Sequence, residues 1–272
     1  MKGREIPVCG KAAVQAVFDR DPAAIKRLYF DYGTSRSIGR ITSELAKLKR
    51  IYRVVTPEEL EKISDTVHHG GIVAVIDAPE LRMVTDEVIA GWATARAPLL
   101  LLDRIGNAHN LGALARTAAF FGVEHLVLPE HPQQALPGEA AYRIAEGGLA
   151  HVTLWSVRDL SALCRALSEH FEVVGTAVGP STASLATWTA RRERSSRSQP
   201  AALVLGNEER GLSDEVKAAC TSLVRIPGHP GRVESLNVSA AAAVLCWELW
   251  GRRPIEPSGE AGAAGHKKGQ PR

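Results

Sequence analysis

The chain has no large excess of one charge, no long apolar run and no paired cysteines. Its 33 Lys and Arg stand against 30 Asp and Glu, a formal net charge of +3, so any nucleic-acid contact would depend on local patches. No apolar run reaches the roughly 18 residues of a membrane span, and the start, MKGREIPVCG, lacks a signal-peptide core. The four cysteines contain no Cys-x-x-Cys pair, which argues against a zinc site or a disulfide framework. We therefore expect a cytoplasmic protein without metal or membrane.

Several motifs of common enzyme classes are also missing. No Gly-x-x-x-x-Gly-Lys-[Ser/Thr] occurs, and no Gly-x-Gly-x-x-Gly opens a helix after a strand, which disfavours a nucleotide-triphosphate enzyme and a dinucleotide oxidoreductase. The nucleophile elbow Gly-x-Ser-x-Gly is absent as well, which weakens a hydrolase interpretation. His68, His69 and His109 lack partners at ligand spacing, so metal catalysis is disfavoured.

What is present is an alternation of strand and helix patterns in two blocks. Residues 1–80 predict a small α/β unit, in which TPEELEKI opens a helix with Thr56 as its N-cap. Residues 81–96 are interpreted as a linker or lead-in helix. Residues 97–253 predict a second unit with a largely parallel sheet covered on both faces; within it, RRERSSRSQP is expected to be a polar basic loop. Residues 254–272, rich in Gly, Ala, Pro and Lys, predict a disordered tail.

Three turns after expected strands of the second unit are rich in Gly and Asn. They are LDRIGNAHNLGALAR, VLGNEERGLSDE and IPGHPGRVESLN. Ligands of parallel sheets bind at the carboxyl ends of strands, glycine allows close backbone approach, and asparagine can cap a helix or join loops. Each turn alone fits an ordinary connection, but three on one sheet edge favour a binding site.

These segments also carry a specific resemblance. NLGALARTAAFFGV, LVLGNEERGLS and IPGHPGRVESLNVSAAAAV, within residues 103–250, resemble the three ordered motifs of the SpoU, or TrmH, family of RNA ribose 2′-O-methyltransferases. The first 80 residues are similar to the family's substrate-binding domain, which is related to a ribosomal-protein fold, through GKAAV and HHGGIVAVI. AYRIAEGG is similar to the YfiF-like branch of tRNA/rRNA methyltransferases.

The resemblance implies a fold, a cofactor and partners. It implies a catalytic domain with a C-terminal trefoil knot, a homodimer formed through that domain, an RNA substrate (rRNA or tRNA) and S-adenosylmethionine as the methyl donor. The apolar helix after ESLN would be tucked into the knot and pack on a partner subunit. By motif position, the implied cofactor-binding residues are Gly206, Asn207, Gly211, Leu212, Ile226 and Leu236.

The resemblance also implies a catalytic set, which is Arg116, Asn110, Glu208, Ser235 and Asn237. A guanidinium is a poor base because its pKa exceeds about 12, so we expect Arg116 to orient the 2′-hydroxyl and a neighbouring phosphate. Asn110 and Asn237 would fix loop and ribose geometry, and Glu208 would pair with an arginine or the RNA sugar. Ser235 or Asn237 would cap the last helix.

Two alternatives stay open on the sequence. The basic residues Arg36, Arg40, Lys47, Lys49 and Arg50, and the stretch RRERSSRS, fit RNA phosphate contacts and equally fit a solvated surface. The third motif of the family usually runs Ile-Pro-Met-x-Gly, whereas IPGHPG lacks the Met and has one extra residue. This departure supports a non-catalytic RNA-binding module as the alternative function.

Overall fold

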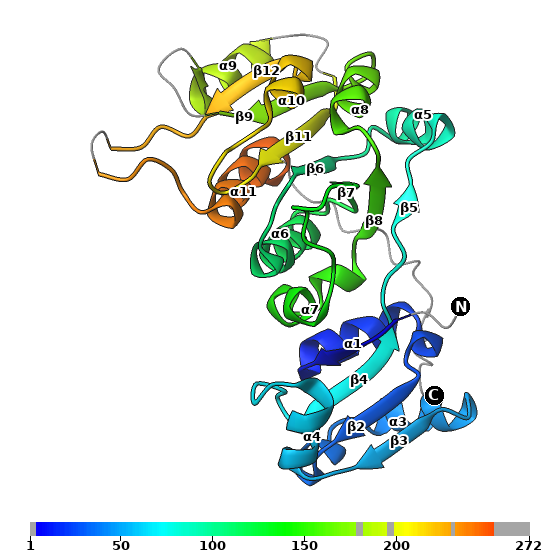
Figure 1. Ribbon diagram of the computed structural model, residues 1–272. Helices are drawn as coiled ribbons and strands as arrows, with labels where there is room; N and C mark the ends of the chain where they lie inside the picture. The colour runs from blue at the N-terminus through cyan, green and yellow to red at the C-terminus, as the bar shows by residue number, and fades with distance from the viewer. Residues whose placement is uncertain (1–3, 178–181, 195–198, 230–231, 253–272) are drawn as a thin grey trace, which may run out of the picture.

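The chain folds around two β-sheets that lie one above the other in Figure 1. The computed structural model describes residues 4–177, 182–194, 199–229 and 232–252. The tail expected at 254–272 lies outside these residues. The mixed α/β class, with a small N-terminal unit ahead of a parallel sheet, is confirmed.

The N-terminal unit is a four-stranded sheet in the order β1-β4-β2-β3. Its strands are β1 (Glu5–Cys9), β2 (Arg27–Phe30), β3 (Ile51–Val54) and β4 (Ile72–Asp77). Its helices are α1 (Lys11–Arg20), α2 (Tyr32–Ser35), α3 (Gly39–Lys47) and α4 (Pro57–Ser64), with a 3-10 turn at Pro22–Ala24. Strands β2 and β3 run parallel and the other neighbours antiparallel. Thr56 caps α4 in a capping box with Glu59, as the sequence predicts.

The second unit is an eight-stranded sheet in the order β10-β12-β9-β11-β6-β7-β8-β5, in which each strand runs parallel to its neighbours. Its strands are β5 (Arg82–Met83), β6 (Leu99–Asp103), β7 (His125–Pro129), β8 (Thr153–Val157), β9 (Glu172–Thr176), β10 (Ala183–Ser184), β11 (Ala201–Gly206) and β12 (Ser222–Arg225). Its helices are α5 (Asp86–Ala95), α6 (Ala108–Phe120), α7 (Glu139–Ala145), α8 (Leu160–Leu167), α9 (Leu185–Arg194), α10 (Asp214–Ala219) and α11 (Val238–Cys246). A 3-10 turn at Gly148–Ala150 follows α7, and a π-helical turn at Trp247–Gly251 follows α11.

Both faces of the large sheet are buried, which explains why its central strands read as continuous apolar runs. In β6, Leu100 and Leu102 join the core cluster that contains residues of α6, α7 and α11. Leu99 and Leu101 join the opposite cluster, with residues of α5, α8 and α10. The alternation of side chains along a strand thus places two helical layers on the sheet.

Two segments differ from expectation. Residues 81–96, interpreted as a linker or lead-in helix, contain α5 and also the edge strand β5, which pairs with β8. The prediction of a basic loop at RRERSSRSQP was wrong for its first four residues, which end helix α9; residues 195–198 lie outside the described part. Leu185 and Trp188, three residues apart, bury one side of α9 in the core, and the Trp188 indole donates to Glu172 at 2.8 Å.

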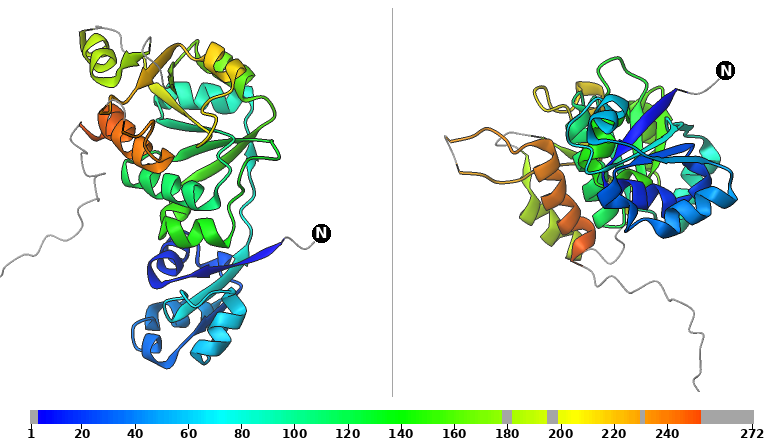
Figure 2. Two further views of the ribbon diagram at one scale, coloured as in Figure 1. Left: turned by 60° about the vertical axis from the view of Figure 1, so that its left-hand side comes forward. Right: turned by 90° about the horizontal axis from the view of Figure 1, so that it is seen from below.

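The two units share a continuous core, and Figure 2 shows the blue N-terminal helices against the green segment that contains α7. Gly147, just after α7, lies so close to α1 that an added Cβ would be 2.9 Å from the Ala16 Cβ. Arg20 of α1 donates to the carbonyls of Ala150 and Val152. The N-terminal unit is therefore packed on the segment that also contacts α6.

Candidate active site

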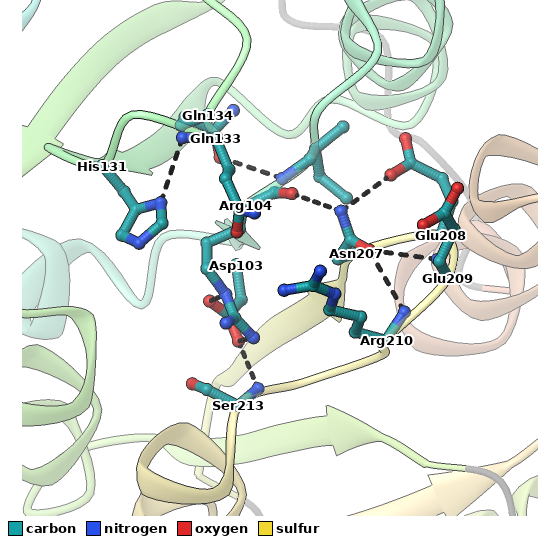
Figure 3. A network of polar contacts seen from close by, with 11 residues as sticks. Asp103, Arg104, His131, Gln133, Gln134, Asn207, Glu208, Glu209, Arg210 and Ser213 are labelled. Carbon is teal, nitrogen blue, oxygen red and sulfur yellow. Dashed lines mark hydrogen bonds and ion pairs between the residues drawn. The ribbon is translucent and has the colours of Figure 1, made fainter.

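The carboxyl ends of β6 and β11 lie side by side because these strands are parallel neighbours, with Asp103 opposite Gly206. The turns that follow are joined by side-chain hydrogen bonds (Figure 3). The Asp103 carboxylate, 3% exposed, accepts from the backbone N–H of Ser213 at 2.6 Å and pairs with the Arg104 Nε at 2.9 Å. The first two of the three turns therefore meet, as the sequence predicts.

Asn207 organises the second turn. Its Nδ2 donates to the Arg104 carbonyl at 2.8 Å, and its Oδ1 accepts from the N–H groups of Glu209 and Arg210 at 3.0 and 3.1 Å. Gly211 closes the turn at φ 68° through two backbone bonds with Asn207. Gly206 must lack a side chain, because a Cβ would lie 2.3 Å from the backbone of Gly211. This geometry requires both ends of the Asn207 amide.

Three residues from three distant segments form a hydrogen-bonded chain. The Asn237 Nδ2 donates to the Asn110 Oδ1 at 3.1 Å, and the Asn110 Nδ2 donates to the Glu208 Oε1 at 2.6 Å. Glu208 also accepts from the Asn207 Nδ2 at 3.3 Å. The predicted members Asn110, Glu208 and Asn237 are thus brought together. The protein partners of Glu208 are amides, whereas the sequence suggested an arginine or the RNA sugar.

The caps of the two helices that enter this site are both asparagines. Asn237 caps α11, its Oδ1 accepting from the Ser239 N–H at 2.9 Å and from the Ser239 hydroxyl at 2.6 Å. Of the two caps suggested for this helix, Asn237 is the one observed. Asn107 caps α6 through the N–H of His109 at 2.8 Å. Helix α6 therefore begins two residues before Asn110, which sits in its first turn.

Arg116 lies six residues farther along α6, about 9 Å along the helix axis at 1.5 Å per residue. Its guanidinium pairs with Glu146 at 3.0 Å, and the two side chains are 57% and 58% exposed. Arg116 is not a member of the hydrogen-bonded chain formed by Asn237, Asn110 and Glu208. The exposed side chain is open to a ligand from solution.

The third turn contributes Asn237, at its end, to the hydrogen-bonded chain of the site. Ile226 is half-buried and packs on the core, whereas Ser235 is exposed and Leu236 is 52% exposed. Figure 1 shows the described part of the segment between β12 and α11 extending away from the sheet before the chain enters α11. Much of the surface of Ser235 and Leu236 is therefore open to solvent just before Asn237. The side chain of Leu212, by contrast, is buried in the core beneath the second turn.

Sequence reasoning missed three contributors to this region. Asp103 ends a buried strand, and a charge there is the signal that could have identified it. The Gln134 Oε1 accepts from the Ile105 N–H at 3.1 Å and supports the first turn, but nothing in its local sequence marks it. Glu146 lies in AYRIAEGG, a segment read only as a mark of a branch of the family.

The described residues offer neither a metal site nor a membrane span. Within the described ranges, no group of three or more His, Cys, Asp or Glu could hold a metal ion. No helix in the described part of the chain is both long and apolar enough to cross a membrane.

The four cysteines are unpaired, and burial raises the pKa of Cys9 to about 11 and those of Cys220 and Cys246 to about 12.

Comparisons with known proteins bear on the same segments. The profile of the SpoU rRNA Methylase family matches residues 97–247, and that of RNA 2′-O ribose methyltransferase substrate binding matches residues 7–82. The uncharacterized tRNA/rRNA methyltransferase YfiF of Escherichia coli O157:H7 is 32% identical over 92% of this chain and 69% of its own. The 23S rRNA (guanosine-2′-O-)-methyltransferase RlmB of Nitrosomonas europaea is 30% identical over 89% and 90%.

An uncharacterized tRNA/rRNA methyltransferase of Haemophilus influenzae is 36% identical over 56% of this chain, and the match spans only 42% of that relative's length. Among solved structures, the AdoMet-bound rRNA methyltransferase of Sinorhizobium meliloti matches with a TM-score of 0.70 at 20% identity, over 93% of this chain and 89% of its own. The SpoU methyltransferase AviRb of Streptomyces viridochromogenes, in complex with AdoMet, gives 0.67 at 20% identity, over 93% and 92%. These structures share the fold. The resemblance seen in the sequence is confirmed, and the chain belongs to the SpoU family of RNA methyltransferases.

Proposed function

We propose that this protein transfers a methyl group from S-adenosylmethionine to the 2′-hydroxyl of a ribose in rRNA or tRNA. Family membership and the name of the Nitrosomonas europaea relative support the reaction type. The observation that carries the proposal is the hydrogen-bonded chain Asn237–Asn110–Glu208, because it assembles polar groups from three segments at the carboxyl edge of a parallel sheet.

The residues at this edge fit a cofactor with an adenine ring and polar ends. Val233 and Leu236, next to Asn237, are apolar and more than half exposed, so their side chains are available to cover an aromatic ring. A Cβ at Gly228 would meet nothing within 4 Å, which leaves the backbone there open to a ligand. We assign the cofactor site to six residues, of which the buried Leu212 would contribute its backbone: Gly206, Asn207, Gly211, Leu212, Ile226 and Leu236.

When bound, S-adenosylmethionine supplies a methyl group on a positively charged sulfur, which leaves as a neutral thioether. The protein must align the ribose oxygen, exclude water and accept the hydroxyl proton, and such positioning supplies several kcal/mol. The amide groups of Asn110 and Asn207 donate to the Glu208 carboxylate. A carboxylate has about four lone-pair sites, so Glu208 can also accept a hydrogen bond from the ribose hydroxyl and then take its proton. Arg116 donates to the ribose and a neighbouring phosphate. Asn110 holds Glu208, and Asn237 and Ser235 border the same ligand.

RNA contact is assigned to basic surfaces of both units. In the N-terminal unit, Arg36 lies over the ring of Tyr32, 5.6 Å from its centroid, and this ring is 71% exposed. Stacked arginine and tyrosine can contact phosphates and bases. Arg40 and Lys47 pair with Asp19 and Glu44, so these two cations must exchange partners to bind RNA. In the second unit, Arg191 and Arg194 of α9 line an open hollow of about 540 Å³.

A second copy of the chain is proposed to cover an apolar surface on α6 and α11. Phe120, Val244 and Trp247 are 75%, 40% and 55% exposed, and large apolar patches of this kind commonly mark interfaces. Light scattering after gel filtration should give twice the mass of 29.2 kDa. A monomer at micromolar concentration would contradict the dimer. The trefoil knot and the cytoplasmic location stay predictions.

The alternative function is a non-catalytic RNA-binding module. The exposed third turn and its departure from the family motif favour this alternative, because both affect the cofactor side of the site. Calorimetry with S-adenosylmethionine separates the two functions. Binding at micromolar cofactor supports the enzyme, and no binding at millimolar cofactor supports the module.

The direct test of the enzyme is transfer of labelled methyl from S-adenosylmethionine to rRNA and tRNA. A 2′-O-methyl group blocks alkaline cleavage at its own linkage, so labelled dinucleotides that resist alkali identify the ribose as the acceptor. We expect label in such dinucleotides with the wild-type chain and none with Glu208→Ala. Label only in alkali-sensitive mononucleotides would place the methyl group on a base and refute ribose methylation.

A further inference from the structure

Glu146 occupies a backbone conformation that its side chain disfavours. Helix α7 ends at Ala145, and Glu146 follows at φ 44° and ψ 44°, in the left-handed region. Helix ends of this geometry usually carry Gly or Asn, because a Cβ crowds the next carbonyl. Glu146 therefore carries local backbone strain, and its carboxylate is fixed beside α6.

The two residues after Glu146 fix its position between the two units. A Cβ on Gly148 would lie 2.7 Å from the Arg116 Cα, so the backbone of this segment touches the backbone of α6. Gly147, at φ 96°, is packed on the other side against Ala12 and Ala16 of α1. Arg143 of α7 also donates to the Thr66 hydroxyl at 3.0 Å. Both units therefore hold Glu146 beside Arg116.

The ion pair between Glu146 and Arg116 leaves much of the guanidinium accessible. Its contact joins the Arg116 Nη2 to the Glu146 Oε2 at 3.0 Å, and the Arg116 side chain is 57% exposed. A guanidinium has five N–H donors, so others are left for a ribose or phosphate oxygen. Because both side chains are more than half exposed, the pair is weak enough in water to adapt when a polyanion arrives.

We propose that Glu146 is a positioning residue for Arg116, and this inference rests on the methyltransferase function proposed above. Glu146 restricts the long arginine side chain to one region beside α6, with its unpaired N–H groups directed to the RNA. Part of the conformational entropy of the Arg116 side chain is therefore lost when the chain folds and need not be lost again each time RNA binds. The glycine pair supplies the close approach that makes this contact possible.

The test is steady-state methylation with variants of Glu146, with cofactor saturating and RNA varied. Glu146→Ala should lower kcat about fivefold, as expected for loss of an exposed ion pair worth at most about 1 kcal/mol, without raising KM for RNA, because it also removes an anion beside the phosphates. Glu146→Gln keeps the shape of the side chain and one acceptor oxygen, so its kcat should lie between those of the wild-type chain and Glu146→Ala. Glu146→Gly relieves the left-handed strain and should keep or raise Tm while lowering kcat. A role limited to folding would move Tm and kcat in the same direction.

A double-mutant cycle then links the effect to the arginine. In an Arg116→Lys background, which keeps a charge but lacks the guanidinium fork, Glu146→Ala should change kcat by less than twofold. Glu130→Ala, which removes another exposed carboxylate facing an arginine, Arg158 at 3.9 Å, is the matched control and should leave kcat unchanged. An unchanged kcat in Glu146→Ala, or an equal loss in both backgrounds, overturns the inference. A wild-type chain without methyl transfer would instead refute the proposed function.

Discussion

Asn207 allows a quantitative test of the site, because its amide acts as donor and acceptor at once. Asn207→Asp keeps the oxygen that accepts from Glu209 and Arg210 but replaces the Nδ2 donor with a second oxygen. That oxygen would face the Arg104 carbonyl at 2.8 Å and the Glu208 carboxylate at 3.3 Å. Asn207→Ala, by contrast, removes all these contacts and leaves space for water.

We expect the isosteric variant, Asn207→Asp, to be less stable than Asn207→Ala. Two unit charges 3.3 Å apart repel by about 1.3 kcal/mol in water and about 5 kcal/mol at an effective dielectric constant of 20. Loss of the bond to the Arg104 carbonyl adds about 1 kcal/mol. We expect Asn207→Asp to lower the free energy of unfolding by about 3 kcal/mol at pH 7.5. Asn207→Ala loses several partly solvated bonds and should cost about 2 kcal/mol.

The pH dependence has a defined sign. Glu208 raises the pKa of the introduced carboxyl in the folded state above its unfolded value of about 3.9. Protonation restores a donor, so the defect relative to wild type is small near pH 4 and grows as the pH rises through the raised pKa. Urea unfolding of both proteins at pH 4.5 and 7.5 measures this difference. Asn107→Asp is the control, because aspartate caps a helix as well as asparagine does. An Asn207→Asp protein that is more stable than Asn207→Ala at pH 7.5 would refute the assignment.

Three further predictions follow from single contacts. Arg116→Ala should lower kcat at least 100-fold while the Kd for S-adenosylmethionine in calorimetry changes less than threefold; transfer at the wild-type rate would show that its assigned role is wrong. Gly206→Ala should lower the free energy of unfolding by about 3 kcal/mol, because the added methyl group overpacks against the backbone of Gly211. Gly228→Ala, whose Cβ would have nothing within 4 Å, should leave the stability measured by urea titration unchanged. Equal stability of the two variants would contradict the close packing of the second turn. Because burial raises the pKa of Cys246 to about 12, alkylation by iodoacetamide at pH 8 should be slow in the folded protein and fast in urea, and a peptide map showing rapid modification of folded Cys246 would disprove its burial.

The elements that the sequence predicts well are those with local causes. The TPEELEKI signature places a cap at Thr56, and the capping box is found there. The apolar runs of β6 and β11 reflect burial on both faces of a parallel sheet, and these strands are neighbours at its centre. Such patterns are readable because each is set by the nearest residues or by one periodicity.

The errors have nonlocal causes. The last four residues of α9, RRER, are predicted as part of a loop because they are strongly polar, whereas the helix is fixed by Leu185 and Trp188 packing on the core and by the Glu172 carboxylate of β9. The edge strand β5 is two residues long and exists only because β8 lies beside it. Neither partner is visible in the local sequence.

The candidate site also combines residues that the sequence predicts with contacts that depend on the packing of distant segments. Asn110, Glu208 and Asn237 were predicted through family motifs, and three-dimensional contacts join them across separations of 98 and 127 residues. The contact between Arg116 and Glu146 could not be predicted, because it depends on how α7 packs on α6. The exposure of Ser235 and Leu236 depends on the path of the third turn, which no local signal specifies.

The account is tested most directly by mass spectrometry of ribose methylation in rRNA and tRNA from a strain without this protein, complemented with the wild-type chain or with Asn110→Ala. We expect one 2′-O-methylnucleoside to be missing in the deletion strain, restored by the wild-type chain, and not restored by the variant at equal protein level. Identical methylation in all strains, or restoration by Asn110→Ala, would contradict the claim that the three joined turns form a methyltransferase site.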